Sequence, residues 1–138
     1  MLRGLTTVSF FATDLEEAKR WYAELLGIQP YYEVPGYIEF RVGDYAHELG
    51  FIDARYAPHP APTEAAGSVT YWHVDDVTAS WERLLAMGAT EHHPPTERGE
   101  GFVTASVIDP FGNILGVMAN PHYLDVLAGV GRPGEATS

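Results

Sequence analysis

The two halves of the chain open with the same pattern of apolar and polar residues. Residues 6–12 and 68–74 alternate between apolar and other side chains, as a half-buried strand does. Each stretch runs into an amphipathic segment with helical spacing, which ends at Gly27 in the first half and at Gly88 in the second. The pattern therefore predicts a strand followed by a glycine-terminated helix at the start of each half.

The first predicted helix has a capping signal at its start. Thr13 is followed three residues later by Glu16, the spacing of a capping box, so Thr13 is expected to cap the helix. Residues 30–34, 37–42 and 45–52 are rich in aromatic and β-branched residues and predict three further strands.

Gly43-Asp44 is expected to form a two-residue hairpin turn between the last two of these strands. In that register Glu39, Arg41 and Glu48 lie on one face of the sheet. A bulge would change part of this assignment.

The second half repeats the plan of the first. We expect a helix over residues 76–87, a loop over 91–101, and strands over 102–108 and 114–119. A spacing of 61 residues separates Gly27 from Gly88 and also Asp14 from Asp75. The first half reads β-α-β-β-β, and we expect the second half to repeat this order, which predicts an α+β protein.

The repeat defines an expected domain organisation. Residues 1–122 are predicted to form a single domain, with one module over about 4–54, a proline-rich linker over 55–67 and a second module over about 68–122. Residues 123–138 are predicted to be a C-terminal extension, frayed from about Arg132.

Composition excludes several classes of function. The 138 residues carry a formal net charge of −11, which argues against a nucleic-acid partner because phosphate binding needs a basic surface. No apolar run approaches the length of a membrane span, and the N-terminal residues lack a signal-peptide pattern. The chain has no cysteine, so disulfides and thiolate chemistry are excluded. We expect a cytoplasmic protein with no membrane or nucleic-acid partner.

Three sequence motifs resemble a known family. They are Ala12–Ala18 with Trp21-Tyr22 and Leu25-Leu26-Gly27, then His73–Val77 with Leu84-Leu85 and Gly88-Ala89, and finally Asp109–Asn113. In these residues the chain resembles the vicinal oxygen chelate superfamily, which includes glyoxalase I, extradiol dioxygenases, fosfomycin-resistance enzymes and bleomycin-binding proteins. The resemblance implies two tandem βαβββ modules that form a cup-shaped mixed sheet with the helices outside, and a homodimer.

The resemblance also implies where a metal would be bound. In metal-dependent relatives one ligand stands seven residues before the cap aspartate of each module; counted back from Asp14 and Asp76, these positions are Thr7 and Val69 here. The other two ligand positions fall on Glu48 and Gly116. A divalent ion needs at least three converging donors, and valine and glycine side chains offer none. We therefore expect no metal and no cofactor.

The side chains expected to line the cup describe a ligand pocket. They mix aromatic, small and polar groups, which suits a sizeable apolar or planar small molecule. Gly50 and Gly116 are expected to make room for the ligand. The predicted ligand-binding residues are Thr7, Ser9, Phe11, Tyr37, Glu39, Arg41, Glu48, Gly50, Tyr71, His73, Ser106, Gly116 and Met118.

Glu48 and His73 are the candidate catalytic residues if the protein is an enzyme. Each also has a structural interpretation, Glu48 as the ion-pair partner of Arg41 and His73 as a hydrogen-bonded histidine beside the helix cap. His92 and His93 look like a metal pair, yet neighbours on an extended segment face opposite ways, so we expect them to be exposed.

The leading hypothesis is a metal-free protein of the glyoxalase/bleomycin resistance type, which sequesters a bulky, partly aromatic ligand in the cup. The first alternative is a lyase, isomerase or dioxygenase of the same superfamily that uses Glu48 and His73. The second is a dimeric scaffold with a vestigial site.

Overall fold

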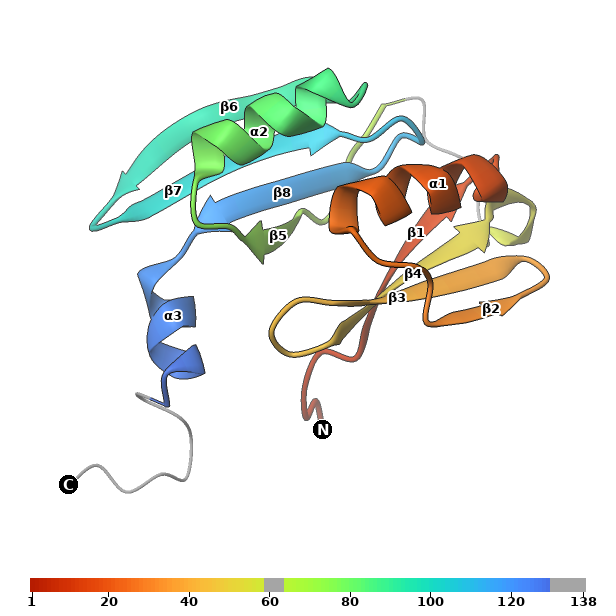
Figure 1. Ribbon diagram of the computed structural model, residues 1–138, viewed down its shortest axis with the longest axis horizontal. Helices are drawn as coiled ribbons and strands as arrows, with labels where there is room; N and C mark the ends of the chain where they lie inside the picture. Colours follow the sequence, from red (N-terminus) through yellow and green to blue (C-terminus); the bar gives the residue numbers. More distant parts are fainter. Residues whose placement is uncertain (59–63, 130–138) are drawn as a thin grey trace. The chain divides into compact units, whose positions relative to one another are not determined.

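The computed structural model describes residues 1–58 and 64–129 (Figure 1). These residues form two compact units. The first unit comprises residues 1–67 together with the turn 109–113, and the second comprises residues 68–108 and those from 114 onward. The middle of the predicted linker and the tail predicted from Arg132 lie outside the described residues.

The first unit has one helix on one face of a four-stranded sheet. The strand order is β1-β4-β3-β2, with β1 parallel to β4 and the other neighbours antiparallel. Its elements are β1 (Thr7–Ala12), α1 (Leu15–Leu26), β2 (Tyr32–Val34), β3 (Tyr37–Val42), β4 (His47–Asp53) and the short 3-10 helix η1 (Ala54–Tyr56).

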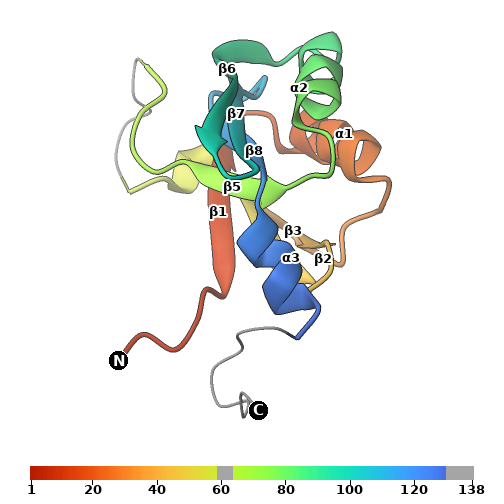
Figure 2. The same cartoon turned by 90° about the vertical axis from the view of Figure 1, so that its left-hand side faces the viewer.

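The second unit repeats this arrangement and adds a helix at its end. The strand order is β5-β8-β7-β6, with β5 parallel to β8 (Figure 1). Helix α3 follows β8 directly, as Figure 2 shows. The elements are β5 (Thr70–His73), α2 (Val77–Ala86), β6 (Thr90–Gly99), β7 (Phe102–Ile108), β8 (Ile114–Ala119) and α3 (Pro121–Leu127).

The predicted α+β class and the repeated β-α-β-β-β order are confirmed.

None of the described helices is long and apolar enough to cross a membrane.

The core of the first unit is aromatic. The Tyr22 ring of α1 lies 4.4 Å from Phe51 of β4, measured between ring centroids, and Phe10 and Phe40 meet Phe51 edge-on. These side chains are buried because alternate residues of each strand point toward α1. The intervening residues of β1, β3 and β4 are left on the opposite face of the sheet.

The turn 109–113 packs in the first unit through one buried carboxylate. Asp109 accepts hydrogen bonds from the backbone N–H groups of Phe111 and Asn113 and from the Tyr22 hydroxyl, the last at 2.6 Å. The Asn113 side chain donates to the backbone oxygen of Phe11 at 3.0 Å. The Asp-Pro-Phe-Gly-Asn motif therefore has a structural role within this unit, because it holds the turn against α1 and β1.

Two predictions for the first unit are wrong in detail. The cap of α1 is Asp14 rather than Thr13, and its carboxylate accepts a hydrogen bond from the backbone N–H of Glu17. The hairpin between β3 and β4 has a four-residue loop, so Val42 pairs with His47. This shift from the expected register is an even number of residues, so every side chain keeps its predicted face.

One prediction for the second unit is also wrong. The expected loop 91–101 is largely strand β6, in which register shifts accommodate Pro94 and Pro95. Proline is tolerated there because β6 is the edge strand. Helix α3 was not predicted; it begins at Pro121, crosses the predicted boundary at residue 122, and has Asn120 as its cap.

Candidate functional site

In each unit, the candidate site residues lie on the sheet face that is turned away from α1 or from α2, respectively. On the first sheet they come from β1, β3 and β4, and on the second from β5, β7 and β8.

Glu48 stands in a small polar network on the first face. Its carboxylate accepts a hydrogen bond from the Thr7 hydroxyl at 2.5 Å, and its other oxygen lies 3.3 Å from the Arg41 guanidinium. The register explains this contact, because Thr7 and Arg41 are the two residues paired with Glu48 on the neighbouring strands. Both oxygens of Glu48 are therefore engaged, which supports its structural interpretation.

Glu39 and Tyr37 form the second part of this network. The Tyr37 hydroxyl donates to Glu39 at 2.7 Å, and Arg41 Nε lies 3.4 Å from the other oxygen of Glu39. Burial raises the pKa of Tyr37 to about 12, and its hydrogen bond to Glu39 adds to that effect. Arg41 also lies over the Tyr31 ring, 4.3 Å from its centroid. The face holds two carboxylates for one guanidinium.

The space above each site glycine is taken up by a tyrosine of the same sheet. A Cβ atom at Gly50 would lie 2.5 Å from the Tyr37 hydroxyl, and one at Gly116 would lie 2.6 Å from the Tyr71 ring. We expected these glycines to make room for a ligand. In the structure, they make room for two tyrosine rings that lie against the backbone.

Ser9, Phe11 and Met118 complete the predicted set. Ser9 pairs with Gly50 and Phe11 with Ile52 on the first face, and Met118 pairs with His73 on the second. Strands β1 and β8 place these three side chains on the predicted faces.

His73 is packed beneath α3. Its ring stacks on Tyr123 with centroids 4.8 Å apart and an interplanar angle of 11°. The backbone N–H of Asn120 donates to its Nδ1 at 3.2 Å. Because Nδ1 accepts, the neutral imidazole carries its proton on Nε2. That atom is buried and makes no hydrogen bond, although Asp75 Oδ1 lies 3.4 Å away. These contacts support the structural interpretation of His73.

Sequence reasoning missed the position of His92. A register shift between Glu91 and His93 interrupts the alternation of β6, so His92 turns onto the same face as Ser106. Its Nδ1 lies 2.8 Å from Ser106 Oγ, in hydrogen-bonding contact. The expectation that both histidines are simply exposed is therefore wrong for His92, which is half-buried. Pro94 and Pro95, which follow the two histidines in the sequence, were a signal that the strand pairing here is irregular.

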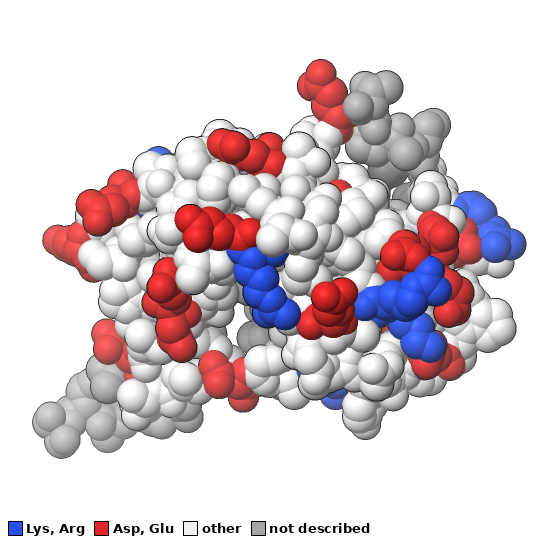
Figure 3. Space-filling view, turned by 45° about the horizontal axis from the view of Figure 1, so that its top comes forward, with Lys and Arg blue, Asp and Glu red and all other residues white. Residues whose placement is uncertain are grey.

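The chain as a whole is strongly acidic, with 19 Asp and Glu residues against 8 Lys and Arg. Acidic side chains are spread over the surface seen in Figure 3, where the basic side chains are fewer. The first face is acidic like the rest of the surface, because it carries Glu39 and Glu48. The second face differs, because its strands place Arg98 and His92 there.

The chain matches the sequence model of a known protein superfamily. The model for the Glyoxalase/Bleomycin resistance protein/Dioxygenase superfamily matches residues 4–117, most of the chain. The protein belongs to this superfamily. Among curated proteins, sequence comparison found no significant match.

Solved structures of this superfamily's type share the fold. A glyoxalase-related enzyme from Fulvimarina pelagi is 22% identical, with a TM-score of 0.68 over 87% of this chain and 90% of that chain. A lactoylglutathione lyase from Agrobacterium tumefaciens is 20% identical, with a TM-score of 0.66 over 89% and 98%. A bleomycin resistance determinant encoded on transposon Tn5 is 22% identical, with a TM-score of 0.63 over 86% and 99%. At these identities the likeness extends to the fold alone.

The residues of this superfamily member do not fit a metal ion. Of the four positions at which metal-dependent relatives are expected to carry ligands, Val69 and Gly116 offer no side-chain donor. The one carboxylate, Glu48, is held by Thr7 and Arg41. Among the described residues no group of three or more histidine or acidic side chains is placed to hold a metal.

Proposed function

We propose that the protein binds a bulky, partly aromatic small molecule without a metal ion and without chemical turnover. The observation that carries this proposal is the state of Glu48, whose two oxygens are bound by the Thr7 hydroxyl and the Arg41 guanidinium. To bind a metal ion or to accept a proton from a ligand, Glu48 would have to give up one of these two contacts.

Exposed and half-exposed aromatic side chains support the binding part of the proposal. Tyr71 leaves 43% of its surface exposed while one side of its ring lies against Gly116. Tyr37 lies against Gly50 in the same manner on the other sheet. An exposed aromatic ring can stack with a planar ligand, and each such contact contributes about 0.5–1.5 kcal/mol.

The enzymatic alternative gains no support from the two residues on which it depends. Glu48 is engaged by Thr7 and Arg41, and the Nδ1 of His73 accepts a hydrogen bond from the backbone N–H of Asn120. A general acid or base needs a free position within hydrogen-bonding reach of its substrate.

Binding of an aromatic probe in the presence of EDTA tests the proposal. Calorimetric titration with 2-naphthoate should give the same affinity with EDTA as with added Zn²⁺ or Mn²⁺. Glu48→Gln should retain measurable affinity, because the glutamine still accepts from Thr7. Binding that requires the metal, or that disappears in Glu48→Gln while the fold persists, would count against the proposal.

A further inference from the structure

We infer that the outer face of the second sheet, the face opposite α2, binds planar aromatic compounds that carry an anionic group such as a carboxylate. This inference deepens the proposed function by naming the ligand class, and so it rests on that proposal. The residues that carry it are Tyr71, His92 and Arg98.

One row of paired residues crosses this face. Gly116 of β8 pairs with Tyr71 on one side and with Ser106 on the other, and Ser106 pairs with His93 of β6. The two residues in the middle of the row are small and buried: the Tyr71 ring lies against Gly116, and Ser106 is in contact with His92. A tyrosine ring stands at one end of the row and the histidines at the other.

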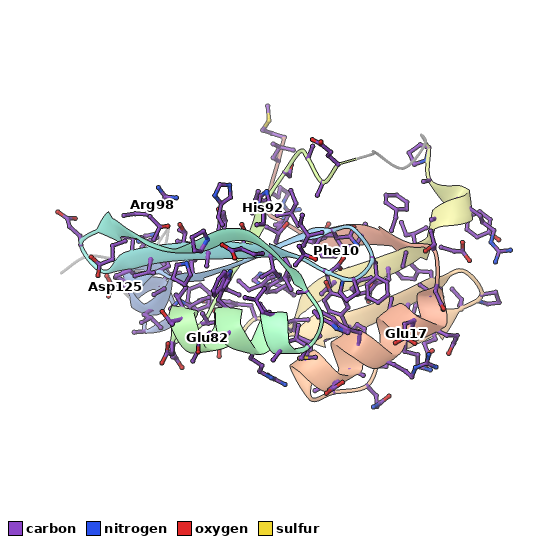
Figure 4. All side chains as sticks on the ribbon, turned by 90° about the horizontal axis from the view of Figure 1, so that it is seen from above. Phe10, Glu17, Glu82, His92, Arg98 and Asp125 are labelled. Carbon is purple, nitrogen blue, oxygen red and sulfur yellow. The ribbon has the colours of Figure 1, made fainter. Side chains whose placement is uncertain are left out.

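Two basic side chains of β6 are held over the face by hydroxyl groups of β7. Ser106 Oγ is 2.8 Å from His92 Nδ1, and Arg98 Nε donates to Thr104 Oγ1 at 3.0 Å. Figure 4 shows His92 and Arg98 on the side of the sheet away from Glu82 of α2. The Nδ1 of His92 and the Nε of Arg98 are used in these contacts. The Nε2 of His92 and the terminal nitrogens of the Arg98 guanidinium have no hydrogen bond to a described residue, so they can bind a ligand.

The charge on this face favours an anion. The carboxylates of β6 lie on the other side, because Glu91 and Glu97 pair with Val107 and Val103, which point away from the Thr104 and Ser106 side chains. Arg98 therefore has no strand carboxylate beside it on its own face. In a chain with a net charge of −11, this local excess of basic groups is a departure from the general surface.

The chemistry of the three groups defines the ligand. Tyr71 offers a ring face that stacks with an aromatic system. Guanidinium and imidazole N–H groups form short, charge-assisted hydrogen bonds with a carboxylate. An aromatic carboxylate can meet both requirements at once if its ring stacks on the exposed side of Tyr71 and its carboxylate reaches His92 and Arg98.

A charge series of naphthalene compounds tests this inference. The full chain is titrated calorimetrically with 2-naphthoate, with its neutral counterpart 2-naphthamide and with the cation 2-naphthylmethylammonium. We expect 2-naphthoate to bind about tenfold more tightly than 2-naphthamide, and the cation to bind most weakly. The advantage of 2-naphthoate should shrink as NaCl is added.

Substitutions test whether the probes bind to this face. Arg98→Gln and His92→Gln should weaken 2-naphthoate several-fold while leaving 2-naphthamide within about twofold, whereas Tyr71→Leu should weaken both. Arg83→Gln is the matched control, because it removes the same charge from the exposed surface of α2. Circular dichroism checks that each variant is folded.

The outcomes separate this inference from the proposed function. Equal affinities for the three probes, a preference for the cation, or equal effects of Arg98→Gln and Arg83→Gln would overturn the inference and leave metal-free aromatic binding intact. Failure of all three probes to bind would also overturn it. Failure of all three probes to bind would count against the proposed function as well, whereas a requirement for metal would count against the proposed function alone.

Discussion

The Tyr22 hydroxyl and the Asp109 carboxylate are separated by 87 positions in the sequence and are joined by a buried hydrogen bond of 2.6 Å. Burial raises the pKa of Asp109, and its hydrogen bonds to Tyr22, Asn113 and Phe111 oppose that rise. The same burial, together with the negative charge of Asp109, raises the pKa of Tyr22 well above its usual value. This pair fastens the turn 109–113 to α1.

Removal of the Tyr22 hydroxyl should therefore destabilise the protein. Tyr22→Phe should lower the free energy of unfolding by about 1.5–3 kcal/mol, the range for a hydrogen bond to a charged group. The pKa of Asp109 should rise further, because one of the bonds that lowers it is lost. Urea denaturation measures the first effect. Tyr56→Phe, at an exposed tyrosine, should change stability by no more than about 0.5 kcal/mol, and an equal loss in both variants would refute the role of the pair.

Tyr37 should make stability depend on alkaline pH. Its pKa in the folded protein is about 12, above the usual value of 10, so the unfolded chain loses this proton first. The stability that it contributes is complete below pH 10 and is lost as the pH rises toward about 12. Tyr37→Phe should remove this part of the pH dependence in denaturation experiments.

Glu39→Gln should lower the pKa of Tyr37 toward 10. The reason is that the negative charge of Glu39, which accepts the hydrogen bond from the Tyr37 hydroxyl, is gone. The absorbance of tyrosinate measures this shift against the Tyr37→Phe background. A Tyr37 titration that is unchanged in Glu39→Gln would contradict the hydrogen bond.

The two site glycines should respond differently to alanine. At Gly116 the new Cβ would lie 2.8 Å from the backbone oxygen of Thr70, which cannot move aside, so we expect a loss of about 1–3 kcal/mol. At Gly50 it would meet only the Tyr37 side chain, which can rotate away, so the loss should be smaller. Gly4→Ala is the control, since nothing lies within 4 Å of its Cβ position. Thermal denaturation ranks the three variants, and a larger loss for Gly50→Ala would contradict this order.

His73 should anchor α3. His73→Phe keeps a ring to stack on Tyr123 but removes the acceptor for the Asn120 N–H, which should cost about 0.5–1.5 kcal/mol. His73→Ala should cost more, because the stacking is lost as well. Hydrogen exchange of the α3 amides should accelerate in both variants. His122→Ala, at an exposed position of α3, should leave exchange unchanged, and unchanged exchange in His73→Ala would show that the anchor lies elsewhere.

The order of elements was predictable because hydrophobic period and glycine position are local signals. The faces of β3 and β4 were also predicted correctly, since an even shift in register keeps each side chain on its face. The hairpin loop itself was not predicted, because Ala46 adopts a positive φ of 52° that its residue type does not announce.

The site was harder to predict because it depends on irregular pairing. The position of His92 follows from a register shift in β6, and a proline-containing edge strand reads as a loop in sequence. Gly50 was correctly placed, yet the tyrosine that fills the space above it comes from a neighbouring strand. Helix α3 carried a usable signal in Asn120-Pro121, a cap followed by a first-turn proline.

The central claim is that the protein works without a metal at the position where metal-dependent relatives are expected to bind one. Elemental analysis by mass spectrometry, on protein purified without chelators and dialysed against metal-free buffer, tests this claim most directly. We predict far less than one equivalent of zinc, nickel, manganese or iron per chain. Retention of a stoichiometric amount of any of these metals, lost in Glu48→Gln, would contradict it.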